Sequence, residues 1–173
     1  TSGLQNNDLI ILAARPAMGK TAFALNIAQN VAKLNQVNVA IFSLEMGADQ
    51  LVSRLVSAEG RIEAHRLKTG NLEGPDSSKV NDVLDAIGIY IDDTPGIRIG
   101  ELRAKCRQLH QQKGLGLVMI DYLQLLSGSK AHGGNRQQEV SEISRMLKEM
   151  ARELKIPVIA LSQLSRQVEN RED

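Results

Sequence analysis

Short apolar runs recur along the chain and are separated by longer segments of mixed character. Each strong run has four to six consecutive apolar or small residues with no polar alternation. Such runs are typical of parallel strands buried on both faces of a sheet. The pattern therefore predicts four buried strands and a shorter fifth one, at residues 9–13, 39–44, 117–120, 157–162 and 89–92.

The segments between these runs space their apolar residues three and four apart, which predicts amphipathic helices. Helices are expected at residues 22–32, 49–59, 80–87, 99–112 and 137–154, with a shorter one at 63–68. Strands alternating with helices predict an α/β fold, a mainly parallel β-sheet flanked by helices, in one domain over residues 1–173. Right-handed crossovers would then place the carboxyl ends of all strands at one edge, where such sheets bind ligands.

The segment between the first strand and the first helix ends in Gly19-Lys20-Thr21. Strand, loop, Gly-Lys-Thr and helix is the order of a phosphate-binding loop, in which free N–H groups at the helix start bind phosphate oxygens. Lys20 would reach the β- and γ-phosphates of ATP, and the Thr21 hydroxyl would bind Mg²⁺. The expected nucleotide-binding residues are Ala14, Arg15, Pro16, Ala17, Met18, Gly19, Lys20, Thr21 and Ala22. Ala14 replaces the first glycine of the usual pattern, which is tolerable only where positive φ is not needed.

Polar side chains follow the other three strong strands. Glu45 ends the second, Asp121 the third and Gln163 the fourth. Asp121 is placed like an acid that holds Mg²⁺ through water, and Glu45 like a general base for the attacking water. Gln163 can donate and accept hydrogen bonds, so it can sense the γ-phosphate. Alternatively, Asp121 is a solvated strand end, Glu45 is a charge that is favourable at a helix start, and Gln163 is an ordinary loop amide. Near the same edge, Asp92 and Asp93 either touch the site or are solvated turn residues.

The net charge of +1 and the 24% of charged residues exclude a chain that is polycationic as a whole. Any nucleic-acid contact must come from a local patch or from several subunits together. The chain has two Phe and two Tyr, too few for stacking bases on aromatic platforms. Cys106 is the single cysteine and falls on the apolar face of a predicted helix, so no disulfide forms within one chain. No apolar run has transmembrane length and no signal peptide begins the chain, which predicts a cytoplasmic protein without a membrane contact.

A glycine-rich loop at residues 127–135 follows the Asp121 strand. Its Lys130, together with Arg136 and Arg166, could contact a nucleic-acid backbone. A mobile surface loop explains the same residue types equally well, so both interpretations stay open.

Four segments together resemble the RecA-like motor domain of bacterial replicative DNA helicases, the DnaB family. They are Ala-Ala-Arg-Pro-Ala-Met-Gly-Lys-Thr (13–21), Phe-Ser-Leu-Glu-Met (42–46), Val-Met-Ile-Asp-Tyr-Leu-Gln-Leu (118–125) and Leu-Ser-Gln-Leu-Ser-Arg (161–166). They occur in the order of the family, and the family tolerates the alanine at position 14.

The resemblance implies an ATP hydrolase and 5′–3′ DNA helicase in which Lys20, Thr21 and Asp121 hold phosphate and Mg²⁺. Glu45 would be the catalytic glutamate and Gln163 the sensor. A ring of six subunits around single-stranded DNA is implied, with primase and a helicase loader as partners in the bacterial replisome. Further strands, an arginine finger and much of the DNA-binding loop are expected beyond residue 173, and a primase-gripping domain before residue 1. The fragment alone is therefore expected to be weakly active or inactive.

Other functions fit the same nucleotide-binding core. A recombinase or recombination mediator would assemble as an open filament on DNA. A non-catalytic nucleotide-binding module would bind ATP without turnover. A phosphotransferase acting on a small molecule is disfavoured, because no acceptor site is apparent in the sequence.

Overall fold

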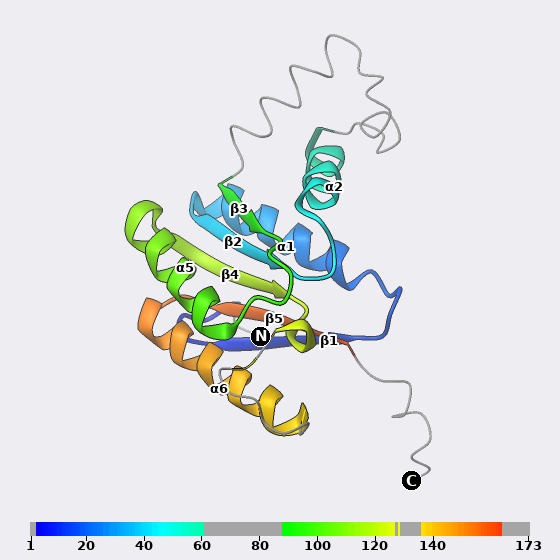
Figure 1. The fold of residues 1–173 in the computed structure, drawn as a ribbon. Helices are drawn as coiled ribbons and strands as arrows, with labels where there is room; N and C mark the ends of the chain where they lie inside the picture. Colours follow the sequence, from blue (N-terminus) through cyan, green and yellow to red (C-terminus); the bar gives the residue numbers. More distant parts are fainter. Residues whose placement is uncertain (1–2, 61–87, 127, 129–135, 164–173) are drawn as a thin grey trace.

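The chain forms a five-stranded, entirely parallel sheet in the computed structural model, which describes residues 3–60, 88–126, 128 and 136–163. The strands lie side by side in the order β1-β5-β4-β2-β3, and all arrowheads point the same way (Figure 1). Both the predicted fold class and the five predicted strands are confirmed. Their bounds are Leu9–Ala14 (β1), Asn38–Ser43 (β2), Ile89–Asp92 (β3), Leu115–Asp121 (β4) and Val158–Gln163 (β5).

Four helices in the described ranges cover the two faces of the sheet (Figure 1). Each begins and ends within a few residues of its predicted bounds. The helix ending at Lys113 is closed by Gly114, whose N–H donates to the His110 carbonyl and whose positive φ of 72° glycine adopts without strain. The predicted helices at 63–68 and 80–87 lie outside the described residues. The bounds are Lys20–Asn35 (α1), Ala48–Gly60 (α2), Ile99–Lys113 (α5) and Arg136–Leu154 (α6), with a short 3₁₀ helix at Leu123–Leu125 (η1) that the sequence did not predict.

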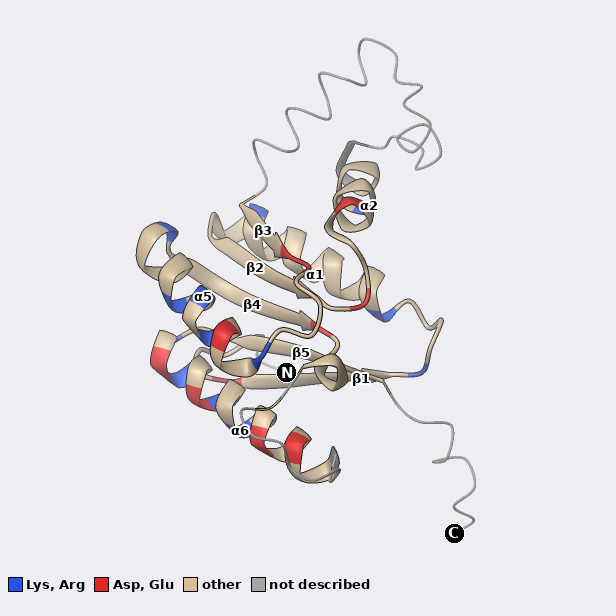
Figure 2. Cartoon of the chain, in the orientation of Figure 1, with Lys and Arg blue, Asp and Glu red and all other residues tan. Residues whose placement is uncertain are grey.

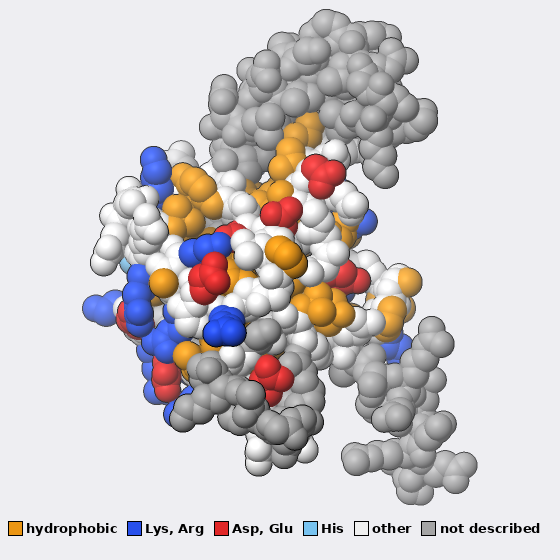
Figure 3. Space-filling view, viewed as in Figure 1, with side chains coloured by type: hydrophobic (Ala, Val, Ile, Leu, Met, Phe, Trp, Pro, Cys, Tyr) orange, Lys and Arg blue, Asp and Glu red, His pale blue; other side chains and the backbone are white. Residues whose placement is uncertain are grey.

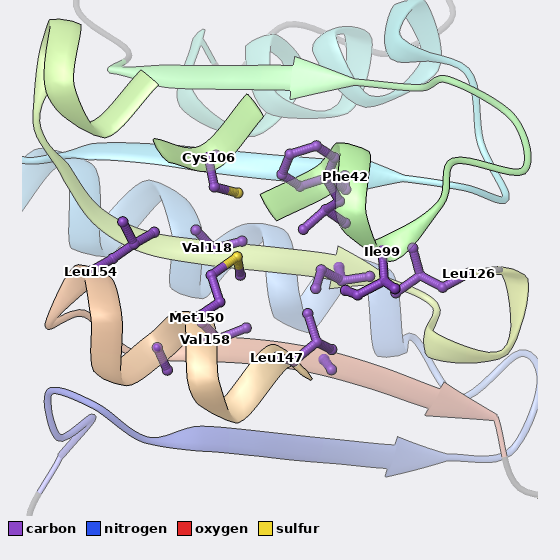
Figure 4. Close-up of a cluster of buried hydrophobic side chains, with 14 of the residues drawn as sticks. Phe42, Ile99, Cys106, Val118, Leu126, Leu147, Met150, Leu154 and Val158 are labelled. Carbon is purple, nitrogen blue, oxygen red and sulfur yellow. The ribbon is translucent and has the colours of Figure 1, made fainter. Parts of the chain in front are cut away.

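Alternate residues of the inner strands enter two separate hydrophobic cores, because successive strand side chains point to opposite faces. On β2, Ala40 and Phe42 pack under α5 and α6, whereas Val39 and Ile41 pack under α1 and α2. Figure 4 shows the first core, where Phe42 and side chains from β4, β5, α5 and α6 point toward one another. Cys106 lies in this core as predicted, and burial raises the pKa of its thiol to about 12.

Helix α1 packs on the sheet through small residues. Ala24, Leu25 and Ala28 are its buried positions, while Phe23 is 57% exposed. The spacing of apolar residues along α1 predicts that its buried face includes Phe23, but the structure does not bury this side chain. Phe23 remains exposed because no described element covers its side of the helix.

Charged side chains concentrate on α5 and α6 and are sparse on the strands (Figure 2). In the face seen in Figure 3, basic and acidic side chains are intermixed over these two helices. Glu153 pairs with Arg107 and, at 3.2 Å, with Arg103. This pairing joins α5 to α6 across the outer layer. No described helix is long and apolar enough to cross a membrane.

Candidate nucleotide-binding site

The loop between β1 and α1 leaves the start of α1 free to bind an anion. The residue before α1 is Gly19, which has φ 76° and makes no side-chain cap. The first turn of α1 contains no acidic residue. Because the first N–H groups of a helix lack partners within the helix, this end is suited to bind phosphate oxygens.

Ala14 does not need positive φ, which is the condition for alanine to replace the first glycine of the loop. It is the last residue of β1, pairs with Gln163 of β5, and does not have positive φ. The left-handed alanine of this loop is Ala17, at φ 63°. A non-glycine residue in that conformation costs about 1–2 kcal/mol. The strain therefore lies within the loop and not at the strand end that replaces the usual glycine.

A buried carboxylate connects the loop to β4. Asp121, 3% exposed, accepts a hydrogen bond of 2.6 Å from Thr21 Oγ1. Lys20 Nζ lies 3.7 Å from Asp121 Oδ1 and 4.8 Å from the centre of the Tyr122 ring, over its face. Lys20 and Thr21 are thus brought to Asp121, although Thr21 and Asp121 are 100 residues apart in sequence.

A cavity of about 360 Å³ opens beside these three residues. Glu45 and Gln163 both line it, so the ends of β2 and β5 do face the Lys20 loop. Asp121, Ala14 and Met18 do not line it, but Asp121 accepts the hydrogen bond from Thr21, which does. The lining residues are Arg15, Pro16, Ala17, Gly19, Lys20, Thr21, Ala22, Glu45, Met46, Arg54 and Gln163.

Three hydrogen bonds hold the loop that carries Glu45. At its start, the Leu44 N–H donates to the Asp121 carbonyl at 2.7 Å. Ser43 Oγ donates to the Met46 carbonyl across the loop at 2.7 Å. At its end, the Ala48 N–H donates to Asp93 Oδ2 at 2.8 Å. Asp93 therefore supports the site from outside the cavity.

Asp92 does not take part in the cavity. It accepts a hydrogen bond of 2.7 Å from Lys105 Nζ on α5. Partial burial alone would raise the pKa of Asp92, but the hydrogen bonds from Lys105 and Thr94 lower it below its usual value. Asp92 thus joins the end of β3 to α5 through its ion pair with Lys105.

Arg54, which the sequence pattern did not indicate, lines the cavity from α2. Its position between Leu51 and Leu55, both buried, did not indicate which way its guanidinium would point. Arg54 therefore joins Arg15 and Lys20 as a third cationic side chain that lines the cavity. Of the residues proposed for DNA contact, Lys130 and Arg166 lie outside the described residues. Arg136 begins α6, and its side chain also lies outside them.

The carboxylate of Asp121 fits a bound cation. Its Oδ1 is buried and, within the described part of the chain, accepts no hydrogen bond, although Lys20 Nζ is nearby. No group of three or more His, Cys, Asp or Glu in the described ranges could hold a metal by itself. Thr21 and Asp121 together offer a hydroxyl and a carboxylate. These are oxygen donors of the kind that Mg²⁺ takes from a protein when its other ligands come from phosphate and water.

Comparison with known proteins decides the family. The model of the DnaB-like helicase C terminal domain matches residues 1–173, the whole chain. The chain belongs to the DnaB-like helicase C-terminal domain family.

Individual members of the DnaB-like family are close to this chain. It is 64% identical to the replicative DNA helicase DnaC of Bacillus subtilis and 62% identical to the replicative DNA helicase DnaB of Geobacillus stearothermophilus. In each comparison all of this chain aligns, but it spans 39% of the length of the relative.

Solved structures of the family share the fold. One solved ATPase domain superposes with a TM-score of 0.85 at 43% identity, covering 98% of this chain and 61% of that one. A DnaB-like replicative helicase, studied with its interactions with primase, superposes with a TM-score of 0.84 at 42% identity. That match covers 98% of this chain and 42% of the helicase chain.

Proposed function

We propose that this chain is the ATP-hydrolysing motor of a replicative DNA helicase, which moves 5′–3′ on single-stranded DNA and unwinds duplex. The observation that carries the proposal is that one cavity is lined by Lys20, Thr21, Glu45 and Gln163 together. Two of these residues can hold a triphosphate, and the other two can act on its outer phosphate. Membership of the DnaB-like family supports assigning this chemistry to a replicative helicase.

The phosphate end of ATP is proposed to lie against the start of α1. The N–H groups of residues 19–22 bind oxygens there, and the Lys20 ammonium neutralises charge on the β- and γ-phosphates. Thr21 and Asp121 would hold Mg²⁺, which draws charge from the same phosphate oxygens when it is bound. Lys20 Nζ lies 3.7 Å from Asp121 Oδ1, so ligand binding would pull the ammonium from the carboxylate toward the phosphate.

Glu45 is proposed as the general base. Its carboxylate is exposed to the cavity and can accept a proton from a water placed in line with the bond to the γ-phosphate. Gln163 would hydrogen-bond the γ-phosphate and report its loss after hydrolysis. Arg54 adds a positive charge on the α2 side of the same phosphate.

The proposed partners follow from the family. The whole protein would form a ring of six subunits around single-stranded DNA, with Lys130, Arg136 and Arg166 as candidate contacts to the DNA backbone. One solved relative is described with its interactions with primase, and primase and a helicase loader are the proposed protein partners here. The proposed setting is the replisome in the bacterial cytoplasm. Further strands and an arginine finger are proposed to come from other parts of the whole protein.

The test uses the whole protein that contains this segment, with ATP, Mg²⁺ and a fork with single-stranded tails. We expect hydrolysis stimulated by single-stranded DNA and unwinding that requires a free 5′ tail. Native mass spectrometry should find six subunits. ATP-dependent open filaments without unwinding would instead indicate a recombinase, and ATP binding without turnover would indicate a non-catalytic module. Either result would overturn the proposal.

A further inference from the structure

The β4–β5 ladder ends before the site is reached. Its last pair joins Ile120 to Ala160, although β5 continues to Gln163. On its other side, Gln163 still pairs with Ala14 of β1. The chain leaves β4 after Asp121 and turns into η1, so the last three residues of β5 have no ladder partner on that side.

The side chain of Gln124 takes the place of the missing strand. Its Oε1 accepts a hydrogen bond from the Gln163 N–H at 3.3 Å, and its Nε2 donates to the Gln163 carbonyl at 3.2 Å. Nε2 also donates to Ser162 Oγ at 2.8 Å. A primary carboxamide carries a donor and an acceptor in one plane, so it can pair with a backbone as a neighbouring strand would.

The residues around Gln124 fix it in place. Leu123 and Leu126 are 4% and 1% exposed and anchor η1 in the core under α5 and α6. The Leu125 and Leu126 N–H groups close η1 by donating to the carbonyls of Tyr122 and Leu123, at 3.0 and 3.2 Å. With both flanks buried, the Gln124 carboxamide is held against the end of β5.

The carboxamide therefore links two parts of the candidate site. Asp121, three residues before Gln124, bonds to Thr21, while the Gln163 side chain lines the cavity. We propose that Gln124 is a positioning residue, which sets the place of Gln163 over the γ-phosphate and couples it to the Asp121 end of β4. This inference rests on the proposed function. It adds Gln124, a residue that does not line the cavity.

The first test is a double-mutant cycle in the whole protein, with kcat and KM for ATP measured at saturating single-stranded DNA. Gln124→Met keeps the length of the side chain and removes the three hydrogen bonds to Ser162 and Gln163. We expect kcat to fall at least about fivefold with KM within about twofold, and Gln124→Met to add almost nothing in a Gln163→Ala background. Gln111→Met, the same change at an exposed position of α5, should leave both constants unchanged.

Two outcomes would overturn the inference. They are an unchanged kcat in Gln124→Met, and effects of Gln124→Met and Gln163→Ala that multiply in the double variant. If Gln124→Met does not fold, Gln124→Glu goes through the same cycle. It keeps the acceptor for the Gln163 N–H but places a carboxylate oxygen against the Gln163 carbonyl.

A second measurement does not depend on catalysis. Amide hydrogen exchange at Gln163 should be roughly tenfold faster in Gln124→Met than in the wild type, while exchange at Ile159 stays the same. Equal protection of Gln163 in both proteins would overturn the inference. If the wild-type protein hydrolyses no ATP, the proposed function fails by itself, and the exchange experiment still decides whether Gln124 holds Gln163.

Discussion

At the scale of single residues, Glu45 is the side chain whose proposed role can be tested most directly. Glu45→Gln keeps its size and removes the proton acceptor. We expect kcat for ATP hydrolysis to fall about 10²–10⁴-fold, because that is the usual contribution of a general base. Nucleotide affinity, measured by fluorescence titration, should change little, since binding rests on Lys20, Thr21 and the start of α1.

The matched control is Glu101→Gln, which makes the same change on an exposed carboxylate of α5. It should leave kcat unaltered. Turnover that survives in Glu45→Gln would remove Glu45 from the mechanism and would leave the cavity as a binding site only.

Residue chemistry also explains which parts of the site could be read from the sequence. Five site residues stand at the end of a strong strand, in the loop after it or at the start of the next helix, so a parallel sheet had to bring them to one edge. They are Lys20, Thr21, Glu45, Asp121 and Gln163. Arg54 and Gln124 could not be found that way, and for Asp93 the sequence left open whether it touches the site or is a solvated turn residue. Their contacts depend on the direction of a side chain that leaves a helix, a turn or η1, and periodicity does not determine that direction.

At the scale of elements, the start of α2 depends on a hydrogen bond from another part of the chain. Asp93 accepts from the Ala48 N–H, 45 residues away, and thus acts as a helix cap. Asp93→Ala should lower the free energy of unfolding by about 1 kcal/mol, the usual cost of losing a cap. It should also lower kcat, because the Glu45 loop ends at Ala48.

Asp93→Asn separates the two possible causes, since it keeps an acceptor oxygen and removes the charge. We expect denaturant unfolding of Asp93→Asn to resemble the wild type. A loss as large as that of Asp93→Ala would mean that charge at the helix start, and not the hydrogen bond, stabilises α2.

The contact between α5 and α6 should depend on pH. Hydrogen bonds from Arg107 and then Arg103 lower the pKa of Glu153 from 4.5 to about 2. Because the folded pKa lies below the unfolded value, the stabilisation is present above about pH 4.5 and is lost as the pH falls toward 2. The Glu153 side chain is 38% exposed, so solvent screening keeps the gain at about 1 kcal/mol or less.

Urea unfolding of the wild type and of Glu153→Gln across this pH range measures the effect. The difference in unfolding free energy should be constant near neutral pH and should vanish at the acid end. Glu149→Gln, whose contact to Arg103 is longer at 3.5 Å, should show a smaller difference. A difference between wild type and Glu153→Gln that persists at pH 2 would exclude the ionised pair as its source.

The elements themselves were largely predictable, for physical reasons. Strands buried on both faces need unbroken apolar runs, and helices that cover a sheet need a spacing near 3.6, so both types leave a clear pattern. The exposed Phe23 shows the limit, because periodicity gives the apolar side of a helix but not what covers it. The 3₁₀ helix η1 was missed because three residues are too few to show a period.

At the scale of the whole molecule, nucleotide binding should stabilise the fold as a unit. The cavity residues run from Arg15 to Gln163 and come from the ends of three strands, α1 and α2, so unfolding of any of them would release the ligand. A non-hydrolysable ATP analogue with Mg²⁺ at about 100 times its Kd should add about 2.7 kcal/mol to the free energy of unfolding. For a chain of this length that corresponds to a rise in Tm of roughly 5–10 °C.

Lys20→Ala should abolish this gain at the same ligand concentration, because the ammonium is the main charge facing the β- and γ-phosphates. Lys33→Ala removes a lysine from the exposed last turn of the same helix and should keep it. Chelation of Mg²⁺ should reduce the gain in the wild type, because the phosphate oxygens would then lack the cation that Thr21 and Asp121 are proposed to hold. If Lys20→Ala retained the full rise in Tm, the ligand would be bound elsewhere, and the cavity at the carboxyl edge of the sheet would lose its assignment.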